Sequence, residues 1–285
     1  MNNNIILAAE TGSDITPEMA QKYGICLVPM HVTMGNQVLD DGSFPPEDVC
    51  AYYDKTGKVP TTSASAPFDF EQAFDAIHKK WPEKKILHLA YSAVTTCSFQ
   101  NALLASQNRD YVKSVDTKHV SVGQAAVVLA VAEYLNENPD ISLEEAVAAA
   151  EKISAATQMC FIPRNLDYLR AGGRVSNAVA LVGNLLALHP LIEIIDGKLI
   201  AGKKYRGKVA KLVPNLIREY VEKHQLSRDH IYFIHSPYLE NEVKQAAENT
   251  VKELGFRKFT WVKTGCVITC HGGPGAFGIV GVSSK

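Results

Sequence analysis

Short apolar runs separated by polar turns predict alternating strands and helices in the first half of the chain. Residues 5–9 form a continuous apolar run, typical of a buried strand, and residues 86–91 form a second one. Residues 124–134 are apolar nearly all round, which indicates a buried helix. Ser142 and Glu145 form a capping box that begins a further helix. This alternation favours an α/β domain with a parallel sheet. We also expect a helix near Pro17, strands at 26–34 and 111–115, and a helix ending near Ser106.

The pattern changes near Gln158, after which strands and hairpin signals are more frequent. Asp196 and Gly197 separate two strand-like runs, and Asp-Gly in that position is a strong hairpin signal. The chain has 285 residues, which is long for one compact domain. We therefore expect an α/β domain with a parallel sheet over 1–157 and an α/β domain with a mixed sheet over 158–285. In the second domain, strands are expected at 160–162, 191–195, 198–203, 231–235, 259–262, 267–270 and 277–282, and helices at 179–188, 209–222 and 240–254.

Charge and composition narrow the possible partners. The 29 basic and 30 acidic side chains give a net charge of −1, so no global field attracts nucleic acid or an anionic membrane. The longest apolar stretch, 125–132, ends at Glu133 and is too short to span a bilayer, so we expect no stable membrane insertion. The N-terminus lacks the pattern of a signal peptide, and six scattered cysteines do not resemble a disulfide scaffold. A cytoplasmic protein is the expectation.

Cys266 and Cys270 lie beside His271, which raises the possibility of a metal site. We expect these cysteines on an extended strand, where two thiols four residues apart share a face but lie too far apart to chelate one ion well. Buried reduced thiols are the favoured interpretation, and no metal is predicted.

Residues 273–278 match the dinucleotide-binding pattern G-x-G-x-x-G. That pattern binds a pyrophosphate where a helix follows the loop, whereas here the next segment is strand-like. The glycines instead indicate a turn that lets the backbone approach another group closely. His271 precedes this turn, and two interpretations stay open: a core histidine bonded to backbone, or a ligand contact.

Two loops rich in hydroxyl groups, 61–67 and 92–98, each precede an expected helix. One hydroxyl in each loop would cap that helix, and the others are free for another role. Several hydroxyls at the carboxyl end of a parallel strand, near helix N-termini, suit a carboxylate or a phosphate.

Basic residues occur in two further segments. Arg170 and Arg174 flank the pair Gly172-Gly173. This segment fits either the C-terminal cap of a helix followed by surface charges, or part of a binding site. Residues 198–211 carry lysines and Arg206, which fits a solvated hairpin edge. The sequence contains no Walker loop, kinase signature, H-E-x-x-H motif or nucleophile elbow, so it does not look designed to bind ATP or hydrolyse an ester.

Together these segments resemble the DegV proteins, the fatty-acid-binding subunits (FakB type) of bacterial fatty acid kinase. The resemblance runs in order through nearly the whole chain. Its motifs are Glu10-Thr11-Gly12-Ser13-Asp14, Val28-Pro29, Thr62-Ser63, the Ser92 loop, Val115-Asp116-Thr117 with Gly123, Leu169-Arg170-Ala171-Gly172-Gly173-Arg174-Val175-Ser176, Leu185 to Pro190, and His271-Gly272-Gly273-Pro274-Gly275-Ala276.

The resemblance implies a non-enzymatic carrier that buries one long-chain fatty acid between its two domains. It would then present the carboxyl group to a separate ATP-dependent kinase subunit, which forms the acyl phosphate. The fatty acid is the expected ligand, and no cofactor or nucleic acid is implied. Arg174 and Arg206 are implied to face the kinase. The residues implied to bind the carboxylate are Thr62, Ser63, Ser92, Thr96 and His271.

The sequence departs from the family pattern at several polar positions. Ala93 stands where the family usually has a second serine, and Gly272 stands where a hydroxyl usually follows the histidine. These changes bear on the class of ligand more than on the fold. One alternative is an enzyme that acts on a small carboxylic acid with His271 as general base. A DNA-binding regulator is a third, and the neutral charge and lack of a helix-turn-helix pattern argue against it.

Overall fold

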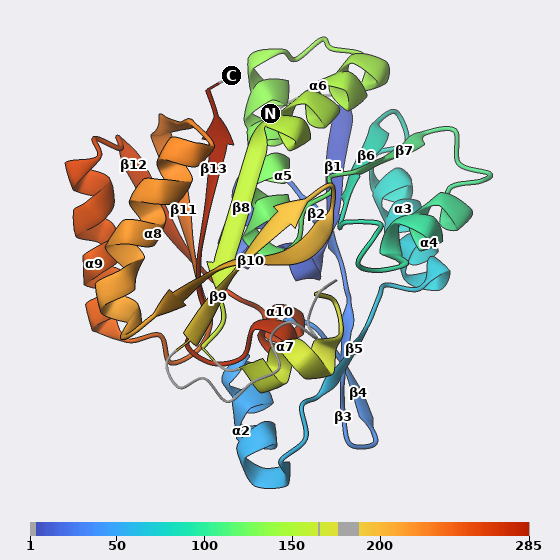
Figure 1. The fold of residues 1–285 in the computed structure, drawn as a ribbon. Coiled ribbons are helices and arrows are strands. Elements are labelled where there is room, and N and C mark those ends of the chain that lie inside the picture. Colours follow the sequence, from blue (N-terminus) through green and yellow to red (C-terminus); the bar gives the residue numbers. More distant parts are fainter. Residues whose placement is uncertain (1–3, 165, 176–187, 285) are drawn as a thin grey trace.

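The computed structural model describes residues 4–164, 166–175 and 188–284 (Figure 1). Its first sheet has four strands in the order β2-β1-β6-β7, and every neighbouring pair is parallel. The predicted parallel α/β arrangement is therefore confirmed for the first half of the chain. The strands are β1 (Ile5–Glu10), β2 (Cys26–Val28), β6 (Lys85–Ala90) and β7 (Val112–Asp116).

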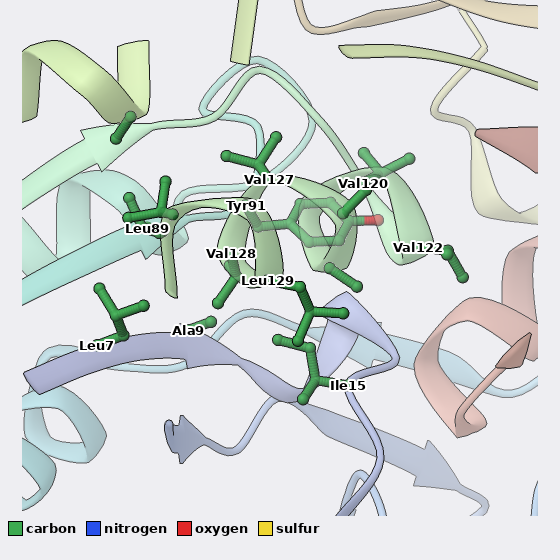
Figure 2. Packing of buried hydrophobic residues seen from close by; sticks show 14 of the residues in the cluster. Leu7, Ala9, Ile15, Leu89, Tyr91, Val120, Val122, Val127, Val128 and Leu129 are labelled. Carbon is green, nitrogen blue, oxygen red and sulfur yellow. The ribbon is translucent and has the colours of Figure 1, made fainter. Parts of the chain in front are cut away.

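The central strands of this sheet are apolar on both faces because helices cover both faces. On β1, Leu7 and Ala9 pack with α5 (Ser121–Glu137), as Figure 2 shows. Ile6 and Ala8 point the other way, toward the cluster built from α3 and α4. The other helices of this half are α1 (Pro17–Tyr23), α3 (Pro67–Lys80), α4 (Ser98–Ala105) and α6 (Leu143–Ala156), with a short 3-10 turn at Thr11–Ser13.

The second sheet has six strands in the order β10-β9-β8-β13-β11-β12. The β11–β12 pair is parallel and the other pairs are antiparallel, so the predicted mixed sheet is confirmed. Helices α8 (Val209–Lys223) and α9 (Asn241–Glu253) pack on one face with the second core cluster. The strands are β8 (Thr157–Ile162), β9 (Leu188–Ile195), β10 (Lys198–Arg206), β11 (Leu226–His235), β12 (Lys258–Lys263) and β13 (Phe277–Ser283).

Helix α5 lies between the two large sheets (Figure 1). Its core cluster joins Leu7 and Leu89 of the first sheet to Ile192 and Val280 of the second. This position explains why the helix is apolar nearly all round: from Ser121 to Ala132 nearly every residue is buried against a sheet or another helix, and only its last turns reach solvent. The first sheet takes its strands from 5–116 and the second from 157–283, whereas the domain boundary at 157/158 stays a prediction.

A third, smaller layer closes one end of the molecule (Figure 1). It brings together segments far apart in sequence, whose side chains share a core cluster around Tyr168 and Cys270. The layer combines the antiparallel sheet β4-β3-β5 with three short helices. The elements are β3 (His31–Met34), β4 (Gln37–Asp40), β5 (Thr61–Ser63), α2 (Glu47–Thr56), α7 (Leu166–Gly172) and α10 (Cys266–Gly272).

Three sequence predictions about this layer are wrong. The expected strand at 26–34 is split, because the chain leaves the parallel sheet at Pro29 and re-enters a different sheet as β3. The segment expected as a strand at 267–270 is the helix α10, and part of the hydroxyl-rich loop 61–67 is the strand β5.

Other local predictions hold. Asp196 and Gly197 make the β9–β10 hairpin, with positive φ at both residues. Ser142 and Glu145 bond reciprocally as a capping box at the start of α6. Of the helix expected at 179–188, residues 179–187 lie outside the described residues, and Leu188 begins β9. In the part of the chain that the structure describes, every helix is too short or too polar to cross a bilayer.

Candidate functional site

A small pocket opens where β5, the loop after β6, β8, α7 and α10 meet. It provides about 60 Å³ of space, comparable to a few water molecules or one small polar group. Its lining combines apolar side chains with hydroxyl groups, an imidazole and a guanidinium. We call it the Thr62–His271 pocket. The described residues that line it are Met30, Thr62, Ser63, Ala64, Tyr91, Thr95, Thr96, Phe161, Leu169, Arg174, Leu199, Val267 and His271.

The polar centre of this pocket is a hydrogen bond between His271 and Thr62. Nε2 of His271, in the last turn of α10, lies 2.9 Å from Oγ1 of Thr62 on β5. Burial and the positive charge of Arg174 lower the pKa of His271 to about 4. The imidazole is therefore neutral at physiological pH and acts as a hydrogen-bonding group rather than a counter-ion.

Two buried carboxylates from the N-terminal half hold the start of α10. Oδ1 of Asp41 accepts N–H bonds from Cys266 at 2.8 Å and Val267 at 3.2 Å. Oδ1 of Asp14 accepts the N–H of Gly265 at 2.6 Å, and Oδ2 accepts the hydroxyl of Ser121. These bonds satisfy backbone donors that the helix itself leaves open, and so fix the helix that carries the histidine. Burial raises the pKa of both Asp14 and Asp41.

Arg174 lies two residues after the end of α7 and lines the same pocket. Its Nη1 donates to the backbone carbonyl of Gly172 at 2.7 Å. The next residue, Val175, forms a bridge with Leu199 of β10, which ties this segment to the six-stranded sheet. The pocket thus joins an arginine cation with a neutral imidazole and a threonine hydroxyl, a set able to hold a carboxylate.

Comparison with known proteins identifies the fold and the pattern of residues. A family model described as "Uncharacterised protein, DegV family" matches residues 4–284. The chain belongs to the DegV family. It is 30% identical over 280 residues to a DegV domain-containing protein of Deinococcus radiodurans, covering 97% of both chains.

Solved structures of DegV proteins share this architecture. One, described as fatty acid binding of a DegV family protein from Thermus thermophilus, is 26% identical with a TM-score of 0.88, covering 98% of this chain and 99% of that one. A second, described as a hypothetical protein from Thermotoga maritima that reveals fatty acid binding function, is 25% identical with a TM-score of 0.81, covering 98% and 99%. Both likenesses extend over the two large sheets.

The structure brings together four of the five residues predicted to bind a carboxylate. Thr62, Ser63, Thr96 and His271 line the Thr62–His271 pocket. Ser92 is fully buried and is not among the lining residues; its hydroxyl donates to the carbonyl of Gly197 at 2.8 Å.

The two arginines predicted to face a kinase occupy different places in this DegV chain. Arg174 lines the same pocket as His271. Arg206 is exposed at the end of β10, away from the residues that line the pocket. Their roles toward a kinase stay predictions.

Sequence reasoning missed two groups that shape the site. Tyr91, only 8% exposed, lines the pocket directly before Ser92, and its apolar surroundings give no local sign of this. Gly172 packs against the imidazole of His271, a contact between α7 and α10. The signal for Gly172 was present in the glycine pair, which also fits an ordinary helix end.

The glycine-rich turn and the cysteines have structural roles here. Gly273 and Gly275 have φ of +69° and +73°, and they reverse the chain from α10 into β13 rather than into a helix. Cys266 and Cys270 are buried on successive turns of α10, and burial raises the pKa of both thiols. Among the described residues, no three His, Cys, Asp or Glu side chains are grouped as metal ligands.

Proposed function

We propose that this DegV protein binds one long-chain fatty acid with its carboxylate in the Thr62–His271 pocket and presents that group to a separate ATP-dependent kinase. The observation that carries the proposal is the Thr62–His271 pair, which shares with Arg174 a pocket that apolar side chains also line. Fatty acid binding in the Thermus and Thermotoga relatives supports it.

The head group needs partners because an unpaired carboxylate removed from water is costly. The hydroxyls of Thr62 and Thr96 and the guanidinium of Arg174 line the pocket and supply donors. Donors of this kind hold a carboxylate without covalent chemistry, so one oxygen can still attack a phosphoryl donor. Arg174 adds the only full positive charge among the described lining residues.

The acyl tail requires more space than the pocket shows. A volume of about 60 Å³ suits the head group alone. We propose that the tail enters by separating apolar side chains of the lining, such as Phe161, Leu169 and Leu199. Each buried methylene contributes about 0.8 kcal/mol, so a long tail supplies on the order of 10 kcal/mol before the cost of ordering.

The proposed partner is a cytoplasmic kinase subunit that uses ATP, as the family resemblance implies. Arg206 is exposed at the end of β10, next to the lysines of the same hairpin, and is available to an acidic surface of such a partner. This division assigns the lipid to the pocket and the kinase contact to the β10 end.

The alternative, an enzyme with His271 as general base, fits the geometry less well. A general base works best with a pKa near the working pH. The pKa of His271 is about 4, because the ring is buried and lies near Arg174. The imidazole would therefore be a weak base at neutral pH, which favours the carrier.

Lipid extraction and mass spectrometry of the protein purified from a bacterial host test the proposal. We expect one long-chain fatty acid per chain, or uptake of one when delipidated protein is offered a panel of free fatty acids. Protein that carries none and takes up none from the panel would refute it. A protein that instead turns over small carboxylic acids without any partner would support the enzyme.

A further inference from the structure

Gly172 and His271 make an unusually close contact between α7 and α10. A side-chain carbon built on Gly172 would lie only 2.2 Å from Nδ1 of His271 and 3.1 Å from Cε1. Non-bonded atoms do not approach to 2.2 Å, so one of the two groups would have to move. Any residue other than glycine at this position would therefore push the imidazole away from its place beside Thr62.

The two ring nitrogens of His271 have different surroundings. Nδ1 of His271 is shielded from solvent and has no hydrogen-bond partner in the described structure. A buried N–H without an acceptor is costly, whereas a bare lone pair facing a Cα–H costs less. Nε2, in contrast, lies 2.9 Å from the hydroxyl of Thr62, which can accept.

The neutral state of the ring agrees with this arrangement. The imidazolium would need an acceptor at both nitrogens, and the described residues provide one only at Nε2. The positive charge of Arg174 acts in the same direction, and its guanidinium is itself held by the carbonyl of Gly172. One glycine thus positions both the imidazole, through its Cα, and the arginine, through its carbonyl.

We propose that Gly172 is a positioning residue that holds His271 with its proton on Nε2. The Nε2–H then donates to Oγ1 of Thr62, and the hydroxyl hydrogen of Thr62 remains free to point into the pocket. On the proposed function, that hydrogen and Arg174 both donate to the ligand. The site is therefore specific for an acceptor-only, ionised carboxylate, and it discriminates against amides and other head groups that present a donor.

The tautomer can be measured without any lipid, by ¹⁵N NMR of histidine-labelled apoprotein at neutral pH. The His271→Gln variant identifies the signals of this residue. We expect a protonated Nε2 and an unprotonated Nδ1. An Nδ1–H tautomer or an imidazolium would overturn the proposal, whether or not the protein binds fatty acid. Absence of lipid binding with the expected tautomer would count against the proposed function alone.

Variants test the positioning role. Gly172→Ala should weaken fatty acid binding by at least about tenfold, as expected for losing hydrogen bonds to a charged group. The matched control is Gly173→Asn, because no atom of the described residues lies within 4 Å of a side-chain carbon there and asparagine tolerates its φ of +62°. When His271 is already replaced by alanine, adding Gly172→Ala should weaken fatty acid binding little further, because the effect of Gly172→Ala acts through the imidazole.

The positioning role would be overturned if the losses in binding free energy caused by Gly172→Ala and by His271→Ala simply added in the double variant. Fatty acid binding of normal strength by folded Gly172→Ala would overturn it too. Thermal unfolding of each variant shows whether it folds. If Gly172→Ala does not fold, the tautomer measurement on the unaltered protein decides the proposal.

Discussion

The hydroxyl of Ser92 donates to the backbone carbonyl of Gly197 at 2.8 Å, across 105 positions of sequence. The bond fastens the tip of the β9–β10 hairpin to the loop that follows β6 in the other sheet. The fit is tight, because a side-chain carbon on Gly197 would lie 2.6 Å from that hydroxyl. Ser92 is thus used to join the two halves of the molecule.

Replacing Ser92 by alanine should lower stability more than it lowers fatty acid affinity. The variant leaves a buried carbonyl without its donor, which costs about 1–3 kcal/mol. Urea unfolding measures the loss, and Ser106→Ala, which removes a surface hydroxyl bonded to Leu103, should cost less. A Ser92→Ala protein of normal stability that no longer binds fatty acid would instead show that Ser92 contacts the head group.

Thr62→Val should weaken binding of fatty acid by about tenfold or more, since it removes one donor to a charged group and keeps the shape. Thr62→Ser keeps the hydroxyl and should bind nearly as well as the original protein. Thr61→Val, at an exposed neighbouring position of β5, serves as the control. Equilibrium titration of delipidated proteins makes the comparison. Equal affinity of Thr62→Val and the original chain would remove Thr62 from the site.

The free energy of unfolding should fall as the pH is lowered from about 6.5 to about 4, where His271 takes up its proton more readily in the unfolded chain. Burial and Arg174 lower its pKa to about 4, whereas an unfolded chain titrates near about 6.5. Between these values the unfolded state binds more protons, so acid favours unfolding and the stability from the neutral ring is lost as pH falls.

His230 and His235, whose pKa values burial lowers to about 4, act in the same direction, so the comparison must be made between variants. The free energy of unfolding is measured at about pH 7 and at about pH 5. The difference between the two values should be smaller in His271→Gln than in the original protein. An identical change in the two proteins would show that His271 does not titrate with a lowered pKa.

Arg206→Ala should leave fatty acid binding intact and slow phosphorylation by the kinase. The side chain is exposed at the end of β10 and does not line the pocket. Titration with fatty acid and a phosphoryl-transfer assay with a bacterial fatty acid kinase subunit measure the two steps separately. Lys198→Ala, at the opposite end of the same strand, is the control. Loss of fatty acid binding in Arg206→Ala would contradict the division between lipid and kinase contacts.

The larger elements of the fold follow from local patterns. Apolar runs, the capping box at Ser142 and the Asp196-Gly197 hairpin act within a few residues, so their signals are visible in the sequence. Helix α10 does not follow from them. Its β-branched residues favour a strand, but Asp41 bonds its first N–H groups from 225 positions away. A pattern of neighbouring residues cannot predict a contact between residues so far apart in the sequence.

The site was predictable only in part for the same reason. The hydroxyl-rich loops indicated an anion site, and the family resemblance placed His271 with Thr62. The local pattern did not show that Gly197 accepts the hydroxyl of Ser92, or that Gly172 packs against the imidazole. Both contacts form only when the two halves of the chain come together.

The Thr62–His271 pocket is proposed to bind the ionised carboxylate of a long-chain fatty acid. The most direct measurement is the affinity of delipidated protein for palmitic acid and for its methyl ester, which shares the tail but lacks the charge. We predict that the acid binds and that the ester binds at least about tenfold more weakly. Equal affinity for the two, or no binding of the acid, would contradict the account.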